Sequence, residues 1–508
     1  MSANLSKTRY CQGVQCPRML WLKKYRPACG DASVVDQAVM DTGSEVGDLA
    51  MGLFGPYVEV PYSAGGAEML RVTRELMSAG TPIITEASFA YDGCFCSVDI
   101  LKNLGGGEVE LYEVKSSSSV KEIYRHDVAY QYYVLTKLGY RVRRACLVHI
   151  DTGYVRHGEL DLQQLFAVTD LTDIAVAGLP EVEENIRRFK QTLSQPDEPA
   201  VEIGEHCSEP YECEFWGYCT QSLPHPNIFD VAAAQKRTKW KNYRAGIVSY
   251  EDIIRARPLN DNCMLQVEHE LYDLPPKIDK KAVAACLNGL SYPLYFLDFE
   301  SFNPAVPLYE DTRPFEQIVF QYSLHYIERE GGQLRHKEFL AEPGADPRRA
   351  LAEQLCRDIP ADVCTVAYNM TFERSRIREL ADLYPDLAEH LLNIREHMRD
   401  LMVPFQKKQY YTRAMQGSYS IKYVLPALFP DDPALDYHNL TGVHNGAEAS
   451  DAFKRMAHMP PEELQAYREH LLTYCGLDTF AMVKIWEKLR EAAARRSEEH
   501  NGSRVTQG

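Results

Sequence analysis

Two carboxylates and a lysine at short spacing stand out in the N-terminal half of the chain. Asp99 is followed, fourteen residues later, by the step Glu113-Val114-Lys115. Alternate residues of a strand share a face, so a strand here would project Glu113 and Lys115 the same way. Carboxylates hold Mg²⁺ or Mn²⁺ through hard oxygen ligands, and a lysine beside them orients the attacking water or stabilises developing charge. The pattern predicts metal-dependent phosphodiester hydrolysis, with Gln131 on the next helix positioning Lys115 or the substrate.

Four cysteines form a second, long-range pattern in the same half of the chain. Cys207, Cys213 and Cys219 lie in a short, loop-like segment rich in aromatic residues, and Cys16 lies near the N-terminus. Three thiolates need a fourth ligand to complete a tetrahedral set, so Cys16 is the expected partner and Cys11 the competing one. Zinc and an iron–sulfur cluster both suit these ligands, and three buried free thiols are the alternative.

A second acidic set occupies the C-terminal half. Asp298 and Glu300 end an apolar run that is typical of a buried strand, and Glu373 begins a helix after another such run. Tyr474 and Asp478 are four residues apart on the terminal helix and so lie on one side of it. Four acidic groups from separate elements suit a two-metal site, at which Tyr474 would hydrogen-bond the nucleophilic water. For each acidic residue of both sets, a solvated surface charge is the alternative.

Cations alternate with aromatic residues in a short basic segment between the two acidic sets. Lysine and arginine contact phosphates, and aromatic rings stack on exposed bases, so this segment is expected to guide a nucleic-acid strand. The alternative is an ordinary solvated helix with a buried tryptophan. The residues expected to bind nucleic acid are Lys236, Arg237, Lys239, Trp240 and Lys241.

Strands and helices must position these groups. Apolar periodicity predicts strands over residues 83–89, 94–101, 109–114, 144–149, 292–299 and 363–368, and helices over 16–22, 120–138 and 461–493. The turn Gly105-Gly106-Gly107 is expected to fold two of these strands into a hairpin, which would bring Asp99 close to Glu113.

The chain is long enough for two large domains. It has 508 residues, of which 45% are hydrophobic and 25% charged, a globular composition. The expected organisation is an N-terminal domain over residues 1–222, a mostly helical connector over 223–289, a second α/β domain over 290–493 and a disordered tail over 494–508.

Charge and cysteine usage narrow the class of protein. A net charge of −17 argues against a protein that simply coats nucleic acid, although clustered metal-binding carboxylates contribute negative charge. The N-terminus has no apolar signal region and no run of eighteen apolar residues follows, so neither secretion nor membrane insertion is expected. Fourteen irregularly spaced cysteines suit a reducing compartment, which predicts a cytoplasmic protein.

Taken in order, the N-terminal motifs resemble those of the RecB-like PD-(D/E)XK nucleases that carry an iron–sulfur cluster, including the CRISPR adaptation and AddB-type nucleases. The resemblance covers roughly residues 5–222 and rests on Cys16-Pro17, Glu86, Asp99, Glu113-Val114-Lys115, Gln131 and the cysteine triplet. It implies a four-iron, four-sulfur cluster on the four cysteines. It also implies DNA cleavage at Asp99, Glu113 and Lys115.

This resemblance has two departures. The family often has a metal-binding histidine after a Gly-x-x-Val step, whereas Gly43-Ser44-Glu45-Val46 is followed here by Gly47. Five residues separate Cys207 from Cys213, where the family commonly has two.

The C-terminal motifs resemble the DEDDy branch of the DnaQ-like 3′–5′ exonucleases, which have an RNase H-like fold. The resemblance covers roughly residues 290–490, including the segment Ser420–Pro426 before the last motif. Its three motifs are Asp298-x-Glu300, Asn369-x-x-Phe372-Glu373 and Tyr474-x-x-x-Asp478. Glu373 stands where that family usually has aspartate. Together, the two halves resemble a bacterial family of fused nucleases.

These patterns predict a metal-dependent deoxyribonuclease with two nuclease-like sites, Mg²⁺ or Mn²⁺, and an iron–sulfur cluster, with zinc as the alternative. The expected partner is DNA, with RNA also possible, and the relatives suggest a helicase or another DNA-processing protein. An alternative function is a nucleic-acid-binding adaptor in which one or both sites are degenerate. A third reading makes the cluster a redox sensor that controls binding.

Overall fold

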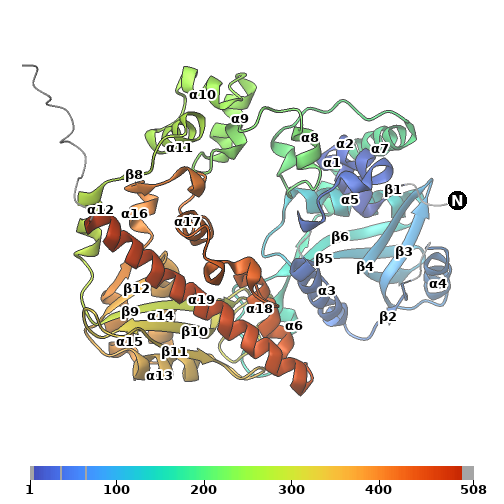
Figure 1. The fold of residues 1–508 in the computed structure, drawn as a ribbon. Helices are drawn as coiled ribbons and strands as arrows, with labels where there is room; N and C mark the ends of the chain where they lie inside the picture. The colour runs from blue at the N-terminus through green and yellow to red at the C-terminus, as the bar shows by residue number, and fades with distance from the viewer. Residues whose placement is uncertain (1–4, 35–36, 63–65, 495–508) are drawn as a thin grey trace, which may run out of the picture. The chain divides into compact units, whose positions relative to one another are not determined.

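The structure is a computed structural model that describes residues 5–34, 37–62 and 66–494. The chain divides into two compact units. Unit 1 is Met1–Ser222 together with Pro304–Glu316, and unit 2 is Leu223–Asn303 together with Gln317–Gly508. Both units combine helices with β-sheet, which confirms the predicted mixed α/β class (Figure 1).

Unit 1 is built on one sheet, in which the described residues form seven strands in the order β2-β3-β4-β5-β6-β7, with β1 parallel to β4. Strands β3, β4 and β5 are antiparallel, and β6 runs parallel to β5. The four strands predicted for this half are confirmed and extend a few residues further. The strands are β1 (Leu5–Ser6), β2 (Val58–Glu59), β3 (Ile83–Tyr91), β4 (Cys94–Gly105), β5 (Glu108–Lys115), β6 (Arg141–Ile150) and β7 (Phe166–Asp170).

The predicted hairpin joins β4 to β5. Gly105, Gly106 and Gly107 have φ angles of +82°, +59° and +79°, a region that residues with a Cβ rarely adopt. Three consecutive left-handed residues therefore need glycine, and they turn β5 back so that Tyr112 pairs with Ile100.

Helices cover both faces of this sheet. Tyr10 of α1, Tyr130 of α5 and Phe189 of α7 belong to the core on one face. Val46 of α3 belongs to the core on the other face. The helices of unit 1 are α1 (Lys7–Gln15), α2 (Pro17–Tyr25), α3 (Gln37–Met51), α4 (Ala67–Ser78), α5 (Glu122–Lys137), α6 (Leu162–Leu165), α7 (Thr172–Ser194) and α8 (Trp216–Thr220), with 3₁₀ turns η1 (Pro27–Cys29), η2 (Ala32–Val34), η3 (Gly52–Phe54) and η4 (Glu205–Cys207).

Two segments belong to units other than those expected. The segment Pro304–Glu316, expected in the C-terminal domain, belongs to unit 1, because Ala305 and Val306 are buried in the core that contains Val46. The connector 223–289, expected as a separate segment, belongs to unit 2. The predicted disordered tail lies outside the described residues from residue 495 onward, and Ala494 ends α19.

Unit 2 has a mixed sheet, in which the described residues form five strands in the order β11-β10-β9-β12-β13. The strands β9, β10 and β11 are antiparallel, whereas β12 and β13 run parallel to β9. The strands of unit 2 are β8 (Lys277–Ile278), β9 (Leu294–Phe302), β10 (Ile318–Ile327), β11 (Arg335–Leu340), β12 (Cys364–Ala367), β13 (Met398–Asp400) and β14 (Tyr410–Tyr411), of which β8 and β14 pair separately.

Two cores flank the sheet of unit 2. Leu351 of α13 and Ile377 of α14 are buried on one side, and Val424 of α17 and Trp486 of α19 on the other. The long helix α19, red in Figure 1, runs along the sheet. The helices of unit 2 are α9 (Lys236–Arg244), α10 (Tyr250–Ala256), α11 (Asp261–Tyr272), α12 (Lys280–Leu287), α13 (Arg348–Asp358), α14 (Thr371–Leu383), α15 (Ala388–Glu396), α16 (Val403–Gln406), α17 (Ile421–Leu428), α18 (Gly446–Met456) and α19 (Pro461–Ala494), with 3₁₀ turns η5 (Ile228–Asp230), η6 (Arg413–Met415), η7 (Pro433–Leu435) and η8 (Tyr437–Asn439).

Helix hydropathy bears on the expected lack of a membrane anchor. Within residues 5–34, 37–62 and 66–494, no helix combines the length and the apolar character that a membrane crossing requires.

Candidate functional site

The structure brings the first acidic set together at the end of β5. Lys115 Nζ lies 2.5 Å from Glu113 Oε1, and Glu113 is fully buried. Asp99 on β4 faces the same strand, and its Oδ2 accepts a hydrogen bond of 2.7 Å from the backbone N–H of Val114. The hairpin therefore places Asp99, Glu113 and Lys115 in one cluster, as the sequence predicts.

Helix α5 adds two side chains to this cluster. Gln131 Nε2 donates to Glu113 Oε2 at 2.6 Å and to Asp127 Oδ1 at 3.1 Å. Lys115 Nζ donates to Asp127 Oδ2 at 2.8 Å. Gln131 therefore holds the two carboxylates that Lys115 also contacts, and its expected role in positioning Lys115 or the substrate stays a prediction. Asp127 was missed, although its spacing of four residues before Gln131 on a predicted helix would have placed both on one face.

A second lysine, also missed, reaches the cluster from α1. Lys7 Nζ donates to both oxygens of Glu113, at 2.8 and 2.9 Å, and lies 3.6 Å from Asp99 Oδ1. Helix α1 begins at Lys7, where the hydroxyl of Ser6 accepts from the backbone N–H of Arg9. A cap at Ser6 is visible in the sequence, but nothing local to Lys7 indicates a contact more than a hundred residues away.

The two lysines govern the charge of the cluster. Burial alone would raise the pKa of Glu113, but the charges of Lys115 and Lys7 outweigh it and hold that pKa well below its usual range. Burial, reinforced by the charge of Glu113, raises the pKa of Asp99 to about 6. Glu113 is thus the firmly ionised carboxylate of the set.

Glu86 is a further carboxylate at this cluster, with a strained backbone. It lies in β3 between Thr85 and Ala87, which pair with β4 without a shift in register, and its φ is +53°. Burial, followed by the charge of Asp99, raises the pKa of Glu86 to about 7. A left-handed backbone conformation is costly for glutamate, and such strain is typical of functional sites.

The second acidic set also converges, within unit 2. Asp298 and Glu300 lie two residues apart on β9, and one ligand atom from each lies within 4.8 Å of the other and of the Cys475 thiol on α19. Burial, followed by the charges of Asp478 and Glu300, raises the pKa of Asp298 well above its usual range. Cys475 was not expected here. It is fully buried, and burial also raises the pKa of its thiol.

Glu373 joins this set from the first turn of α14. The residue is 3% exposed, and its Oε2 is buried without a hydrogen-bond partner among the described residues. Burial raises the pKa of Glu373 to about 8, and the charge of Asp400 adds to the shift. Asp400 itself accepts the backbone N–H groups of Asn369, at 3.0 Å, and Met402, at 2.9 Å, so it supports the loop before α14.

Asp478 completes the set and is held by two tyrosines. Tyr437 donates to Asp478 Oδ1 at 2.5 Å, and Tyr474, one turn earlier on α19, also hydrogen-bonds Asp478. Burial raises the pKa of Asp478 to about 6 against these hydrogen bonds. Tyr474 thus contacts a carboxylate directly. Tyr437, on the turn η8, has no sequence signal that links it to Asp478.

The carboxyl groups of unit 2 lack the cations that unit 1 supplies. Among the described residues, no lysine or arginine forms an ion pair with Asp298, Glu300, Glu373 or Asp478. Within the same part of the chain, Lys422 on α17 is the cation that lowers the pKa of Glu300 and Asp478, without a direct contact. Glu300 and Glu373 are buried, and Asp298 and Asp478 are partly buried. Carboxyl groups placed so close together without ion pairs favour either protonation or compensation by bound cations.

The four predicted cysteines line one small pocket of unit 1. Cys16, Cys207 and Cys213 are buried, Cys219 is partly buried, and all four line the same cavity. The backbone N–H of Gly204 donates to Cys207 Sγ at 3.5 Å, and the N–H groups of residues 18 and 19 act on the Cys16 thiol at the start of α2. Burial raises the pKa of each thiol, and these N–H groups oppose the rise.

The four sulfurs of this pocket do not form a compact group of three ligands. Among the described residues, two groups of three possible ligands have atoms that all lie within 4.8 Å of one another, and the cysteines are not among them. Tetrahedral zinc would bring its sulfurs to about 3.8 Å from one another. Cys11, the competing fourth ligand, does not line the pocket.

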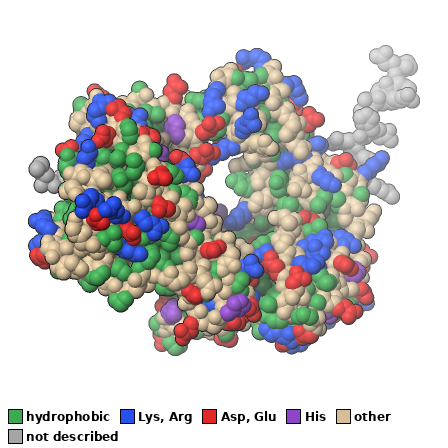
Figure 2. All heavy atoms as spheres, turned by 180° about the vertical axis from the view of Figure 1, so that it is seen from behind, with side chains coloured by type: hydrophobic (Ala, Val, Ile, Leu, Met, Phe, Trp, Pro, Cys, Tyr) green, Lys and Arg blue, Asp and Glu red, His purple; other side chains and the backbone are tan. Residues whose placement is uncertain are grey.

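The basic segment forms α9, but not all of it can contact nucleic acid. Trp240 is 3% exposed and packs edge-on against Phe229 and Tyr243. Lys239 Nζ donates to the carbonyl of Phe229 at 2.8 Å. The expected stacking role of Trp240 is therefore corrected, because its ring is buried. Lys239 is partly buried, and its expected phosphate contact stays a prediction. The exposed residues of the set are Lys236, Arg237 and Lys241. Figure 2 shows lysine and arginine side chains on the lobe that contains α9.

Comparison with known proteins bears on the second unit. The model of a family described as "Domain of unknown function (DUF2779)" matches residues 295–420, which include Asp298, Glu300 and Glu373. The chain is also similar to "Uncharacterized protein UU173" of Ureaplasma parvum serovar 3, with 27% identity over 231 residues, 41% of this chain. The match covers 33% of that relative's length.

Proposed function

We propose that this protein is a metal-dependent nuclease that hydrolyses phosphodiester bonds in DNA, with one site in each unit. The observation that carries the proposal is the convergence of Asp298, Glu300, Glu373 and Asp478 in unit 2. These groups come from β9, α14 and α19, elements up to 180 residues apart. Carboxylates from separate elements gather in a core at a large desolvation cost, which bound divalent cations would offset.

The residues of unit 2 fit Mg²⁺ or Mn²⁺. All four acidic groups offer oxygen ligands, and the orphaned Oε2 of Glu373 is a buried acceptor that a cation would satisfy. Divalent ions supply an activated water and neutralise charge on the scissile phosphate when they are bound. Tyr474 and Tyr437 orient Asp478 by hydrogen bonds, and Tyr474 would hold the attacking water beside it.

The residues of unit 1 fit one such ion, held by Asp99 and Glu113. Lys115 contacts Glu113 and Asp127, so its ammonium is fixed next to the carboxylates, where it would stabilise charge on a phosphate. The amide of Gln131 donates to Glu113 Oε2. The mixed sheets of the two units support the proposed PD-(D/E)XK-like fold for unit 1 and RNase H-like fold for unit 2.

The cysteine pocket fits a four-iron, four-sulfur cluster on Cys16, Cys207, Cys213 and Cys219. Backbone N–H groups aimed at ligand sulfurs are a means by which proteins stabilise such clusters. Such a cluster would join the start of unit 1 to residues 207–219.

The test uses Lys115→Ala and Asp298→Asn, singly and together, on end-labelled single- and double-stranded DNA and on RNA, in Mg²⁺ and Mn²⁺. Each single variant should lose one class of product, and the double variant should lose all cleavage. Asp382→Asn, an exposed acid on α14, is the matched control and should cleave normally. Full cleavage by the double variant would show that neither site is catalytic.

One observation favours a second candidate, an adaptor that binds nucleic acid without cleaving it. In unit 1, Glu113 is already paired with Lys7 and Lys115, and Gly47 stands where relatives carry a metal-binding histidine. This candidate predicts tight DNA binding with no nucleotide release in Mn²⁺. A helicase or another DNA-processing protein is the partner that either function suggests.

A further inference from the structure

Lys7 occupies the centre of the carboxylate cluster in unit 1. Its ammonium donates to Glu113 Oε1 at 2.8 Å and Oε2 at 2.9 Å, and lies 3.6 Å from Asp99 Oδ1 and 4.0 Å from Asp127 Oδ1. These carboxylates come from β5, β4 and α5. Among the described residues, Lys7 is the cation within 4.0 Å of both proposed metal ligands, Asp99 and Glu113.

Both oxygens of Glu113 are already engaged. Oε1 accepts from Lys7 and Lys115, and Oε2 accepts from Lys7 and Gln131. A carboxylate oxygen has two lone pairs, so these donors use the directions that a metal ion would need. An ion that binds Glu113 must therefore displace at least one donor.

Lys7 is the donor best placed to yield. The side chains of Lys7 and Lys115 are 21% and 24% exposed, whereas Gln131 is fully buried. Lys115 is anchored by a second short contact, at 2.8 Å, to Asp127. Lys7 also lies close to Asp99, the second proposed ligand, so it would compete with an ion at both Glu113 and Asp99.

We infer that Lys7 sets the metal affinity of the unit 1 site by acting as an internal cation that competes with Mg²⁺ or Mn²⁺ for Glu113 and Asp99. The inference rests on the proposed function, because it concerns the same carboxylates. Lys7 is a positioning residue, because its ammonium contacts Glu113 and lies close to Asp99.

The test measures Mn²⁺ binding rather than cleavage, by electron paramagnetic resonance of free Mn²⁺ in the full-length protein. Asp298→Asn with Glu300→Gln forms the parent, so that binding in unit 2 is disabled. Lys7→Met in this parent should bind Mn²⁺ at least tenfold more tightly, because a competing charge is removed. Lys7→Arg, which keeps the charge, should stay within about threefold of the parent.

Further variants keep the result interpretable. Lys102→Met removes the same charge elsewhere in unit 1 and should change affinity less than twofold. Glu113→Gln should abolish the binding measured. If Lys7→Met does not fold, as judged by circular dichroism, Lys7→Gln replaces it, since glutamine keeps a hydrogen-bond donor without the charge.

The outcomes separate the inference from the proposed function. Binding that is unchanged or weaker in Lys7→Met and Lys7→Gln overturns the inference alone, and shows that Lys7 only supports the ligands. Failure of both parent and variants to bind Mn²⁺ overturns the inference and the proposed metal site of unit 1 together.

Discussion

The hydroxyl of Tyr437 lies 2.5 Å from Asp478 Oδ1, and the ring centroid of Tyr437 lies 6.1 Å from that of Tyr474, the second tyrosine that hydrogen-bonds this carboxylate. Tyr474 belongs to the motif visible in the sequence, whereas Tyr437 comes from a separate turn, η8. The carboxylate that ends the acidic set is therefore held from two directions.

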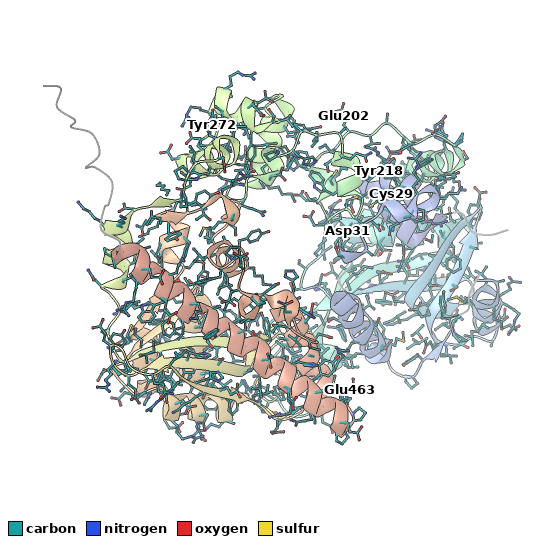
Figure 3. All side chains as sticks on the ribbon, in the orientation of Figure 1. Cys29, Asp31, Glu202, Tyr218, Tyr272 and Glu463 are labelled. Carbon is teal, nitrogen blue, oxygen red and sulfur yellow. The ribbon has the colours of Figure 1, made fainter. Side chains whose placement is uncertain are left out.

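Loss of this contact should weaken the proposed site of unit 2. In Tyr437→Phe, Asp478 loses a hydrogen bond to a charged acceptor, worth about 1.5–3 kcal/mol, so turnover should fall about tenfold or more with little change in KM. Steady-state kinetics on end-labelled DNA in the Lys115→Ala background would measure this effect. Tyr272→Phe, on an exposed tyrosine labelled in Figure 3, is the matched control. Equal kinetics in both variants would show that Tyr437 does not contribute to the site.

The cysteine pocket makes a prediction about metal content. Cys207→Ser should abolish the broad absorbance near 400 nm expected of an iron–sulfur protein purified without oxygen, and should lower its iron content. Cys29→Ser is the control, because Cys29 is exposed, does not line the pocket and is labelled in Figure 3. A colourless, zinc-containing wild-type protein would contradict the cluster.

Helix α3 has room for the histidine that is common in the RecB-like nucleases, which the N-terminal motifs resemble. A β-carbon built at Gly47 would have no atom within 4 Å. Gly43 lies one turn earlier on the same face, and a β-carbon built there would lie 4.0 Å from the hydroxyl oxygen of Ser116, the residue after Lys115. Gly47→His should therefore raise the Mn²⁺ affinity of unit 1 about tenfold, measured with unit 2 disabled. Gly47→Ala is the control, because alanine also raises the helix propensity of this position but has no imidazole. No difference between histidine and alanine would mean that position 47 does not face the ion.

Asp358 gives unit 2 a stability that depends on pH. It is buried, but hydrogen bonds from Tyr322 at 2.7 Å, Lys337 at 2.9 Å and Gln354 at 3.1 Å overcome the burial and lower its pKa. A carboxyl group whose folded pKa is depressed stabilises above its unfolded pKa, and this stability is lost as pH falls through the folded value.

Asp358→Asn should therefore cost about 2–3 kcal/mol of unfolding free energy at pH 7. The difference from wild type should shrink below about pH 4, where the unfolded carboxyl group begins to protonate. Urea unfolding at several pH values would measure the difference. The exposed Asp382→Asn should change stability by less than about 0.5 kcal/mol at any pH. A cost that does not vary with pH would mean that the charge of Asp358 is not what stabilises the fold.

Local patterns were sufficient for the elements and for the spacing of the motifs. The strands β3, β4 and β5 and the helix α5 follow from periods of two and 3.6 residues, which depend only on neighbours along the chain. The glycine turn fixes the hairpin because φ is a local property. Asp99, Glu113 and Lys115 could therefore be placed together from the sequence.

Long-range contacts and burial were decided by the tertiary structure. Lys7 pairs with Glu113 across 106 residues of sequence, and no local pattern indicates this contact. Trp240 is buried against Phe229, although the basic-aromatic pattern around it is equally compatible with an exposed ring. The segment Pro304–Glu316 lies in the other unit because Ala305 and Val306 are buried there.

The sequence by itself determined which residue types recur at chemically useful spacings: the Glu-x-Lys step, the cysteine triplet, and the acids Asp298, Glu300 and Asp478. Only the folded chain decided the charge balance, with two lysines inside the acidic cluster of unit 1 and no paired cation among the described residues around that of unit 2. The physical reason is that periodicity is written along the chain, whereas the partner of a buried charge is set by which distant segments pack together.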